Sequence, residues 1–178
     1  RRNLSRAARS TRLSGGRTSP VFNLHNGNEV DMRNLPLGLV ALFLASATNQ
    51  AISAEIEVKM LNSGVKGAMV FEPNFIKAMP GDVIHFVPSD QGHNVESIKG
   101  MLPDGVQPFK SGFNKEYRLP VEKQGLYGVK CTPHYGMGMV ALIEVGSASN
   151  KDLIAAVKHP GKAKQVFQEL LAQVGSGS

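Results

Sequence analysis

Between residues 55 and 148 the chain alternates apolar and polar positions in short stretches. Ile56, Val58 and Met60 alternate mostly with charged residues, a period-2 pattern typical of a strand with one buried face, although Leu61 interrupts the polar face. Further apolar runs follow, and turn signals rich in Pro, Gly and Asp separate them. Many short strands at this spacing predict a mainly β fold, a sandwich or barrel, and disfavour a parallel α/β fold. The runs are Val70–Phe71, Val83–Val87, Leu126–Lys130 and Met139–Val145.

The period changes to that of a helix near the C-terminus. Asp152–Lys158 carries apolar residues at helical spacing, and Pro160 ends this predicted helix. Gly161–Val174 predicts a second amphipathic helix. Both helices are expected to pack their apolar faces on the sandwich. These faces consist of Leu153, Ile154 and Val157 in the first helix and Val166, Phe167, Leu170, Leu171 and Val174 in the second.

The first 54 residues differ in pattern from the remainder. Residues 1–31 are rich in Arg, Ser and Gly and lack apolar periodicity, which is typical of disordered sequence. Residues 32–54 begin with Met and Arg, continue with an apolar stretch over Leu35–Ala47 and end in small residues, the pattern of a secretory signal peptide. We therefore interpret residues 1–31 as an upstream extension, with the Met as the natural start. Cleavage after Ala54 and cleavage directly after the apolar stretch both fit this pattern.

Charge is distributed unevenly along the chain. The formal net charge is +6 at pH 7, but residues 1–54 hold seven Arg and two acidic residues, so residues 55–178 are close to neutral. This near-neutral charge removes the main electrostatic argument for nucleic-acid binding. The apolar stretch of the leader is too short for a membrane-spanning helix. We predict a monomer without membrane insertion, with a sandwich at residues 55–148 and, at residues 149–178, two helices and a flexible tail.

The candidate chemistry lies in the segment Cys131–Met139. Cys131, His134 and Met139 form a C-x2-H-x4-M spacing that concentrates three soft or borderline donors. A thiolate and a thioether select copper over hard cations, and imidazole suits both copper oxidation states. Two His and one Cys in a plane, with a long axial Met, form the ligand set of an electron-transfer copper site. The segment supplies three of these four donors, so the pattern requires a second His from elsewhere.

The second His is chosen from the remaining histidines. His25 lies in the leader, His85 lies within a predicted strand, and His159 lies between the predicted helices, where we expect it to be solvated. His93 directly follows a strand and is next to Gly92, where a loop can approach the Cys131–Met139 segment closely. We therefore predict that His93 is the upstream ligand.

Three further residues are expected to support the ligands. The backbone N–H of Asn94, which follows His93, is placed to donate to the Cys131 sulfur, and its side chain is placed to fix the ligand loop. Pro133 and Tyr135 are expected to stiffen this loop and exclude water from it.

The sequence around these residues resembles the pseudoazurins, which are periplasmic members of the cupredoxin family. The resemblance implies an eight-stranded Greek-key β-sandwich with two C-terminal helices. It also implies one copper ion held by the residues that the chemistry selects, with Met139 rather than Met137 as the axial ligand. The implied ligands are His93, Cys131, His134 and Met139. The matching segments are residues 57–58, 60–62, 67–73, 92–99 and 129–139.

The resemblance further implies a periplasmic carrier of single electrons, which is not an enzyme. Its transient partners would be redox proteins such as a nitrite reductase or a c-type cytochrome, with the electron passing through the exposed edge of His134. Lys110 and Lys130 stand where members of the family dock acidic partners, whereas Ser63 and Gln91 stand where Lys is common. We therefore expect only weak electrostatic steering.

Other classes of function explain the same residues less completely. A copper chaperone or storage protein would share the ligands, but it would favour flexible tracts rich in Met and Cys. An enzyme with Cys131 as nucleophile and His134 as base would need a third orienting group, which the sequence does not supply. A zinc-stabilised module leaves the Met residues unexplained, because zinc rarely binds thioethers.

Overall fold

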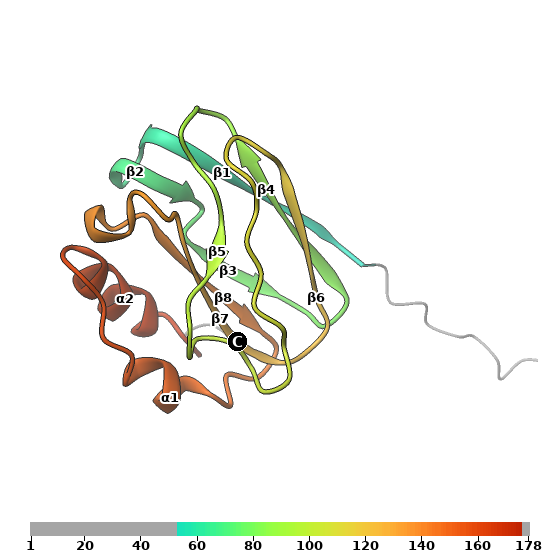
Figure 1. The fold of residues 1–178 in the computed structure, drawn as a ribbon. Coiled ribbons are helices and arrows are strands. Elements are labelled where there is room, and N and C mark those ends of the chain that lie inside the picture. The colour runs from blue at the N-terminus through green and yellow to red at the C-terminus, as the bar shows by residue number, and fades with distance from the viewer. Residues whose placement is uncertain (1–52, 176–178) are drawn as a thin grey trace, which may run out of the picture. The chain divides into compact units, whose positions relative to one another are not determined.

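The computed structural model describes residues 53–175, and it shows two four-stranded β-sheets followed by two helices (Figure 1). The predicted upstream extension and all but the last two residues of the predicted signal peptide lie outside the described residues. The predicted eight-stranded sandwich with two C-terminal helices is confirmed. The elements are β1 (Glu55–Gly64), β2 (Gly67–Glu72), β3 (Phe75–Ala78), β4 (Asp82–Pro88), β5 (Glu96–Ser97), β6 (Tyr117–Val121), β7 (Gly125–Lys130), β8 (Val140–Val145), α1 (Lys151–Ala155) and α2 (Ala163–Leu171).

The strand order follows from crossovers between the two sheets. The first sheet has the order β2-β1-β4-β6 and the second the order β3-β8-β7-β5. β1 is antiparallel to β2 but parallel to β4, and β3 is parallel to β8. Neighbouring strands are therefore often distant in sequence, as expected for a Greek-key sandwich.

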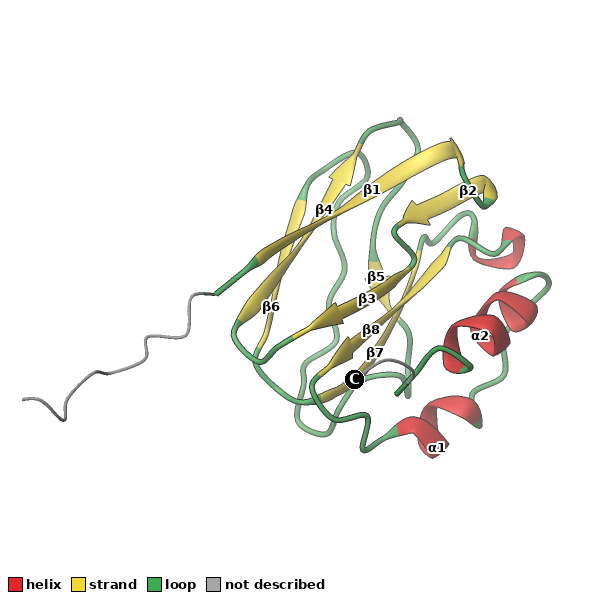
Figure 2. Ribbon diagram, turned by 180° about the vertical axis from the view of Figure 1, so that it is seen from behind, coloured by secondary structure: helices red, strands yellow, loops and turns green. Residues whose placement is uncertain are grey.

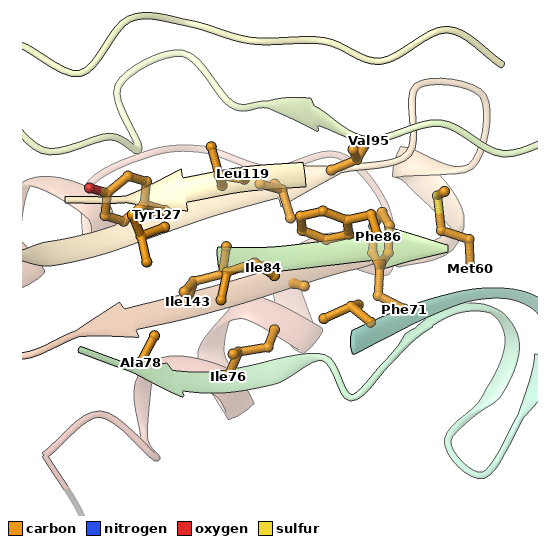
Figure 3. Close-up of a cluster of buried hydrophobic side chains, with 14 of the residues drawn as sticks. Met60, Phe71, Ile76, Ala78, Ile84, Phe86, Val95, Leu119, Tyr127 and Ile143 are labelled. Carbon is orange, nitrogen blue, oxygen red and sulfur yellow. The ribbon is translucent and has the colours of Figure 1, made fainter. Parts of the chain in front are cut away.

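The main core lies between the two sheets, where the period-2 pattern of β1 and β4 directs alternate side chains inward (Figure 3). Val58 and Met60 of β1 are fully buried, as are Ile84 and Phe86 of β4. Phe86 packs edge-on against Phe71, with ring centroids 5.8 Å apart. Each buried aliphatic or aromatic side chain stabilises the sandwich by roughly 1.5–3 kcal/mol through removal of apolar surface from water.

The two helices lie beside the second sheet (Figure 2), and a second apolar cluster joins them to its outer face. Ile154 of α1 and Phe167 of α2 are buried in it, together with Leu142 of β8. Every residue of β8 is buried, because the main core covers one face of this strand and the helices cover the other. The packing expected for both helices is confirmed, except that Leu153 is 67% exposed and was wrongly placed on the apolar face.

Both helices are shorter than the predicted segments. α1 ends at Ala155, and the chain then turns through Pro160 and Gly161, which has a positive φ of 50°. α2 begins only at Ala163. Among the described residues, no helix combines the length and apolar character needed to cross a membrane.

Candidate metal centre

The segment Cys131–Met139 forms a loop that closes on itself between β7 and β8. The strands pair up to Lys130 and Val140, so the loop begins and ends at a paired position. The backbone N–H of Cys131 donates to the carbonyl of Met139 (2.9 Å), and the N–H of Met139 donates to the carbonyl of His134 (3.2 Å). A short 3-10 turn spans Tyr135–Met137 inside the loop. These bonds hold the three predicted donor residues within one compact loop.

Two imidazoles flank the Cys131 sulfur. The Nδ1 atom of His134 lies 3.5 Å from the Cys131 Sγ atom, and the Nδ1 atom of His93 lies 3.7 Å from it. The sulfur and one nitrogen of each ring all lie within 4.8 Å of one another. The two rings meet edge to face, with their centroids 5.0 Å apart. In the described part of the chain this is the one cluster of His, Cys or acidic side chains with a spacing suited to a metal ion.

The two candidate axial methionines have opposite environments. Met139 is fully buried in the main core cluster, which also contains Cys131. Met137 is 49% exposed at the end of the 3-10 turn. The structure therefore places Met139 inside the protein with the thiol and leaves Met137 at the surface.

His93 is enclosed and fixed from behind. Its side chain is fully buried, and its Nε2 atom lies 3.0 Å from the Oδ1 atom of Asn62. Burial lowers the pKa of His93, and the neighbouring His134 lowers it further, whereas Asp90 acts in the opposite direction. The neutral imidazole favoured by this environment is the form that binds metals. A hydrogen bond from Nε2 to Asn62 leaves Nδ1 as the free acceptor that faces the sulfur.

His134 differs from His93 in exposure, since it is only partly buried and lies in the loop beside the exposed Pro133 and Gly136. The described structure thus combines one enclosed imidazole with one that reaches the surface. A group at the surface edge of the cluster is the natural point of contact for another molecule.

Asn94 supports the thiol as predicted. Burial raises the pKa of the Cys131 thiol, whereas hydrogen bonds with the backbone of Asn94 and of His134 lower it. The Asn94 side chain accepts the backbone N–H of Thr132 at Oδ1 (2.8 Å) and donates from Nδ2 to the Thr132 hydroxyl (3.0 Å). This pair of bonds ties the loop that carries His93 to the loop that carries Cys131.

The other histidines lie away from the cluster. His85 is held between Glu55 and Glu116, each 2.9 Å from one of its ring nitrogens, on the first sheet. The prediction that His159 is solvated is wrong: its Nδ1 atom lies 2.7 Å from the Tyr135 hydroxyl and its ring stacks on Phe167. Burial lowers the pKa of His159. His25 lies outside the described residues.

Sequence reasoning did not identify Thr132 and Glu96 as part of the centre. The Thr132 hydroxyl donates to Glu96 of β5 at 2.6 Å, and this contact depends on the pairing of β5 with β7. A strand of two residues has no periodicity to predict its pairing. The position of Thr132 directly after Cys131 is the only signal that points to it.

Comparison with known proteins identifies the family of this chain. Residues 58–146 match the copper binding proteins of the plastocyanin/azurin family. The pseudoazurin of Paracoccus pantotrophus is 53% identical over 139 residues, which cover 78% of this chain and 96% of that protein. The chain belongs to the pseudoazurin family. The pseudoazurin of Methylorubrum extorquens is 44% identical over 140 residues, which cover 78% of this chain and 95% of that protein.

Solved pseudoazurin structures share the fold. The structures from Methylobacterium extorquens AM1 and Hyphomicrobium denitrificans are each 47% identical, with TM-scores of 0.66 and 0.65. Each comparison covers 67% of this chain and 98% of the other chain. The predicted cupredoxin fold and the predicted copper-binding family are therefore confirmed. Pseudoazurins are blue copper electron carriers, so the chain is a member of a copper-binding electron-carrier family.

The donor chemistry of the centre fits this metal. A thiol whose Sγ lies between two imidazole Nδ1 atoms provides three donors that both copper oxidation states accept. The thiol is buried, so a metal bound there would be held out of water. Carboxylates, which hard cations prefer, are absent from the cluster that the described residues form.

Proposed function

We propose that this protein carries single electrons on one copper ion in the periplasm and is not an enzyme. Its transient partners are redox proteins such as a nitrite reductase or a c-type cytochrome. The observation that carries the proposal is the Cys131 sulfur placed between two imidazole Nδ1 atoms at 3.5 and 3.7 Å. The proposed ligands are His93, Cys131, His134 and Met139.

The bound copper supplies the exchange of one electron without making or breaking covalent bonds in the protein. The chain contributes a site whose donor residues are held by the surrounding hydrogen bonds. Backbone hydrogen bonds fix Cys131 and Met139, and Asn62 orients His93. Because these donors are held by the fold, they move little when the charge of the site changes, which favours rapid electron exchange.

The electron is proposed to leave through His134, the partly exposed ring of the cluster. The surface around it is expected to be a small apolar patch, and a patch of this kind suits weak and short-lived complexes. In the described structure Met137, Pro133 and Gly136 are exposed, and Met69 and Pro88 are partly exposed. These five residues are the proposed docking patch.

The ligand assignment is tested by the visible spectrum of the copper-loaded protein. Cys131→Ser is expected to abolish the intense visible absorption, because this absorption comes from charge transfer between thiolate and copper. His85→Ala is the matched control, since His85 lies on the first sheet between two glutamates, and it is expected to keep the colour. Colour that survives Cys131→Ser, or that is lost in His85→Ala, would show that the ligand set is wrong. A colourless wild-type protein that binds only Cu(I) would instead favour copper storage.

The cellular part of the proposal needs separate tests. Cell fractionation is expected to find the mature protein with periplasmic markers. Reduced protein mixed with a nitrite reductase and with a panel of c-type cytochromes is expected to transfer electrons to at least one of them. Protein that stays in the cytoplasmic fraction, or that reduces none of these partners, would contradict the proposal.

A further inference from the structure

A chain of polar side chains runs from the surface of the second sheet to the Cys131 thiol. It begins at Glu96 on the two-residue strand β5, which pairs with β7 so that Glu96 lies opposite Lys130. The Glu96 side chain is 24% exposed, so it is neither in open solvent nor in the apolar core. Its position beside the start of the ligand loop is therefore set by the sheet.

The Glu96 carboxylate accepts a short hydrogen bond from Thr132, the next residue of this series of polar side chains. The Thr132 hydroxyl donates to Glu96 Oε2 at 2.6 Å. This hydrogen bond is the largest cause of the lowered pKa of Glu96, ahead of the contacts with Lys110 and Lys130. The carboxylate is therefore ionised at neutral pH, and a charged acceptor strengthens the bond to the hydroxyl.

The Thr132 hydroxyl cannot rotate freely once it donates to Glu96. Its oxygen is then the acceptor for the Asn94 Nδ2 group at 3.0 Å. The other polar atom of the Asn94 amide, Oδ1, accepts the Thr132 backbone N–H at 2.8 Å. With both ends of the amide engaged, the orientation of Asn94 is fixed.

Asn94 in turn contacts the sulfur. Its Oδ1 atom lies 3.7 Å from Cys131 Sγ, and a hydrogen bond with its backbone lowers the pKa of the thiol. Glu96 is thus separated from the sulfur by two side chains that are each fixed by hydrogen bonds.

Two lysines hold Glu96, which is the outer end of this series of polar side chains. Lys110 Nζ lies 3.1 Å from Glu96 Oε2, and Lys130 Nζ lies 3.7 Å from Glu96 Oε1. Both carboxylate oxygens are therefore engaged, which limits rotation of the Glu96 side chain.

We infer that Glu96 is a positioning residue for the copper centre, which acts through Thr132 and Asn94 on the Cys131 sulfur. The inference rests on the proposed role of Cys131 as a copper ligand. Glu96 does not touch the sulfur, so its effect depends on its acceptance of the Thr132 hydroxyl more than on its charge. Replacement by Gln keeps an acceptor oxygen in the same place, whereas replacement by Ala removes it.

The first test uses the metal-free protein, where no copper chemistry intervenes. Amide hydrogen exchange of Thr132, measured by NMR, is expected to be roughly three- to tenfold faster in Glu96→Ala, which lies within the range for loss of one ordinary intramolecular hydrogen bond. Glu96→Gln keeps an acceptor oxygen but loses the charge, so its exchange rate is expected to lie between those of wild type and Glu96→Ala. Glu122→Gln, which neutralises an exposed carboxylate in the turn before β7, is the control for a change of net charge.

The second test uses the copper-loaded protein. The thiolate-to-copper absorption band is expected to shift in Glu96→Ala and in Thr132→Val, which removes the hydroxyl but keeps the backbone N–H. The shift is expected to be smaller in Glu96→Gln than in Glu96→Ala, and the band is expected to stay in place in Glu122→Gln. Equal behaviour of Glu96→Ala and Glu96→Gln in both measurements would overturn the inference, because charge alone would then explain the effect. If Glu96→Ala does not fold, the comparison of Thr132→Val with Glu96→Gln decides the same question.

Failure of this inference is separable from failure of the proposed function. An unchanged band in Glu96→Ala and Thr132→Val removes the positioning role, but the loss of colour in Cys131→Ser would still support the ligand assignment. Colour that survives Cys131→Ser removes both.

Discussion

At the scale of single residues, Asp82 fixes the beginning of the sandwich. One oxygen of its carboxylate accepts the backbone N–H of Met79 at 2.7 Å, and the other accepts that of Ala54 at 2.8 Å. These two bonds, the first of them most strongly, lower the pKa of Asp82. The carboxylate thus ties the residue that precedes β1 to the turn that precedes β4.

The lowered pKa of Asp82 predicts a specific dependence of stability on pH. A depressed folded-state pKa contributes stability above the ordinary Asp value of about 3.9, and this contribution is lost as the pH falls through the folded-state value. Asp82→Asn is therefore expected to lower the free energy of unfolding at pH 7, and the difference from wild type is expected to shrink below about pH 4. Urea unfolding at pH 7 and at pH 2.5–4 measures both quantities.

The control for this prediction is Asp104→Asn, which changes an exposed carboxylate in the loop before β6. It is expected to have little effect at either pH. If Asp82→Asn lowers the free energy of unfolding by the same amount at every pH, the role of the ionised carboxylate would be contradicted.

At the scale of elements, β8 contributes buried residues to both apolar clusters. The main core covers one face and the helices cover the other, and Ile143 is fully buried. Ile143→Ala is expected to lower the free energy of unfolding by about 2–5 kcal/mol, since it leaves a cavity between the sheets. Val65→Ala, at a residue that is 91% exposed, is the control and is expected to change stability by less than about 0.5 kcal/mol. Equal losses in the two variants, measured by urea unfolding, would contradict this account.

The connection between α1 and α2 packs on the ligand loop. The Lys162 N–H donates to the carbonyl of Gly136 (2.9 Å), and His159 contacts the Tyr135 hydroxyl. Gly161 has a positive φ, and a Cβ atom there would collide with the Gly136 carbonyl oxygen. The helices therefore support the 3-10 turn next to His134 as well as covering the sheet.

This contact predicts the effect of a single methyl group. Gly161→Ala is expected to lower the free energy of unfolding by roughly 1–3 kcal/mol, from backbone strain together with the collision. Gly175→Ala is the matched control, because Gly175 also has a positive φ but a Cβ there meets nothing within 4 Å. A loss in Gly161→Ala no larger than in Gly175→Ala would indicate strain alone. The melting temperatures of both variants provide the comparison.

The strands that sequence analysis identified and those it missed differ in their place in the sheet. The long apolar runs of β4, β7 and β8 are central strands, and their pattern predicted them. β3, β5 and β6 are edge strands of two to five residues, and β6 contains Pro120, which disfavours a central strand. Their pairing depends on the assembled sandwich, so no local pattern predicts it.

The centre shows the same division. The proposed donors of the loop follow from the spacing of Cys131, His134 and Met139, because residues close in sequence stay close in space. The choice of His93 needed a loop argument, and the structure brings it to the sulfur. Glu96 was not predictable, since its contact with Thr132 exists only after β5 pairs with β7.

At the scale of the whole molecule, the surface charge near the centre is partly compensated. Lys110 and Lys130, the two lysines expected to face an acidic partner, both pair with Glu96. Their field is therefore weaker than that of two free lysines, and exposed charges are screened beyond about 8–10 Å at ordinary salt. We expect electrostatic steering of an acidic partner to be present but mild.

This compensation predicts how the transfer rate depends on salt. The electron-transfer rate to an acidic partner is expected to fall with ionic strength, and Lys110→Gln is expected to lower it roughly two- to fivefold at low salt. Lys164→Gln, at an exposed residue of α2, is the control. Glu96→Gln is expected to make the salt dependence steeper, because it releases both lysines. A rate that is independent of salt in all variants would assign docking to the apolar patch alone.

The paired positions Lys130 and Val140, which close the ligand loop, divide the centre into a hairpin tip and a scaffold. Everything between these two positions is the tip of a β-hairpin, so its length and donors can vary while the strand pairing below stays intact. His93 belongs to the scaffold instead, since its place depends on the crossover between the sheets. Protein engineering could therefore replace the whole hairpin tip, with its three proposed donors, as one unit, while His93 and the paired strands below remain unchanged.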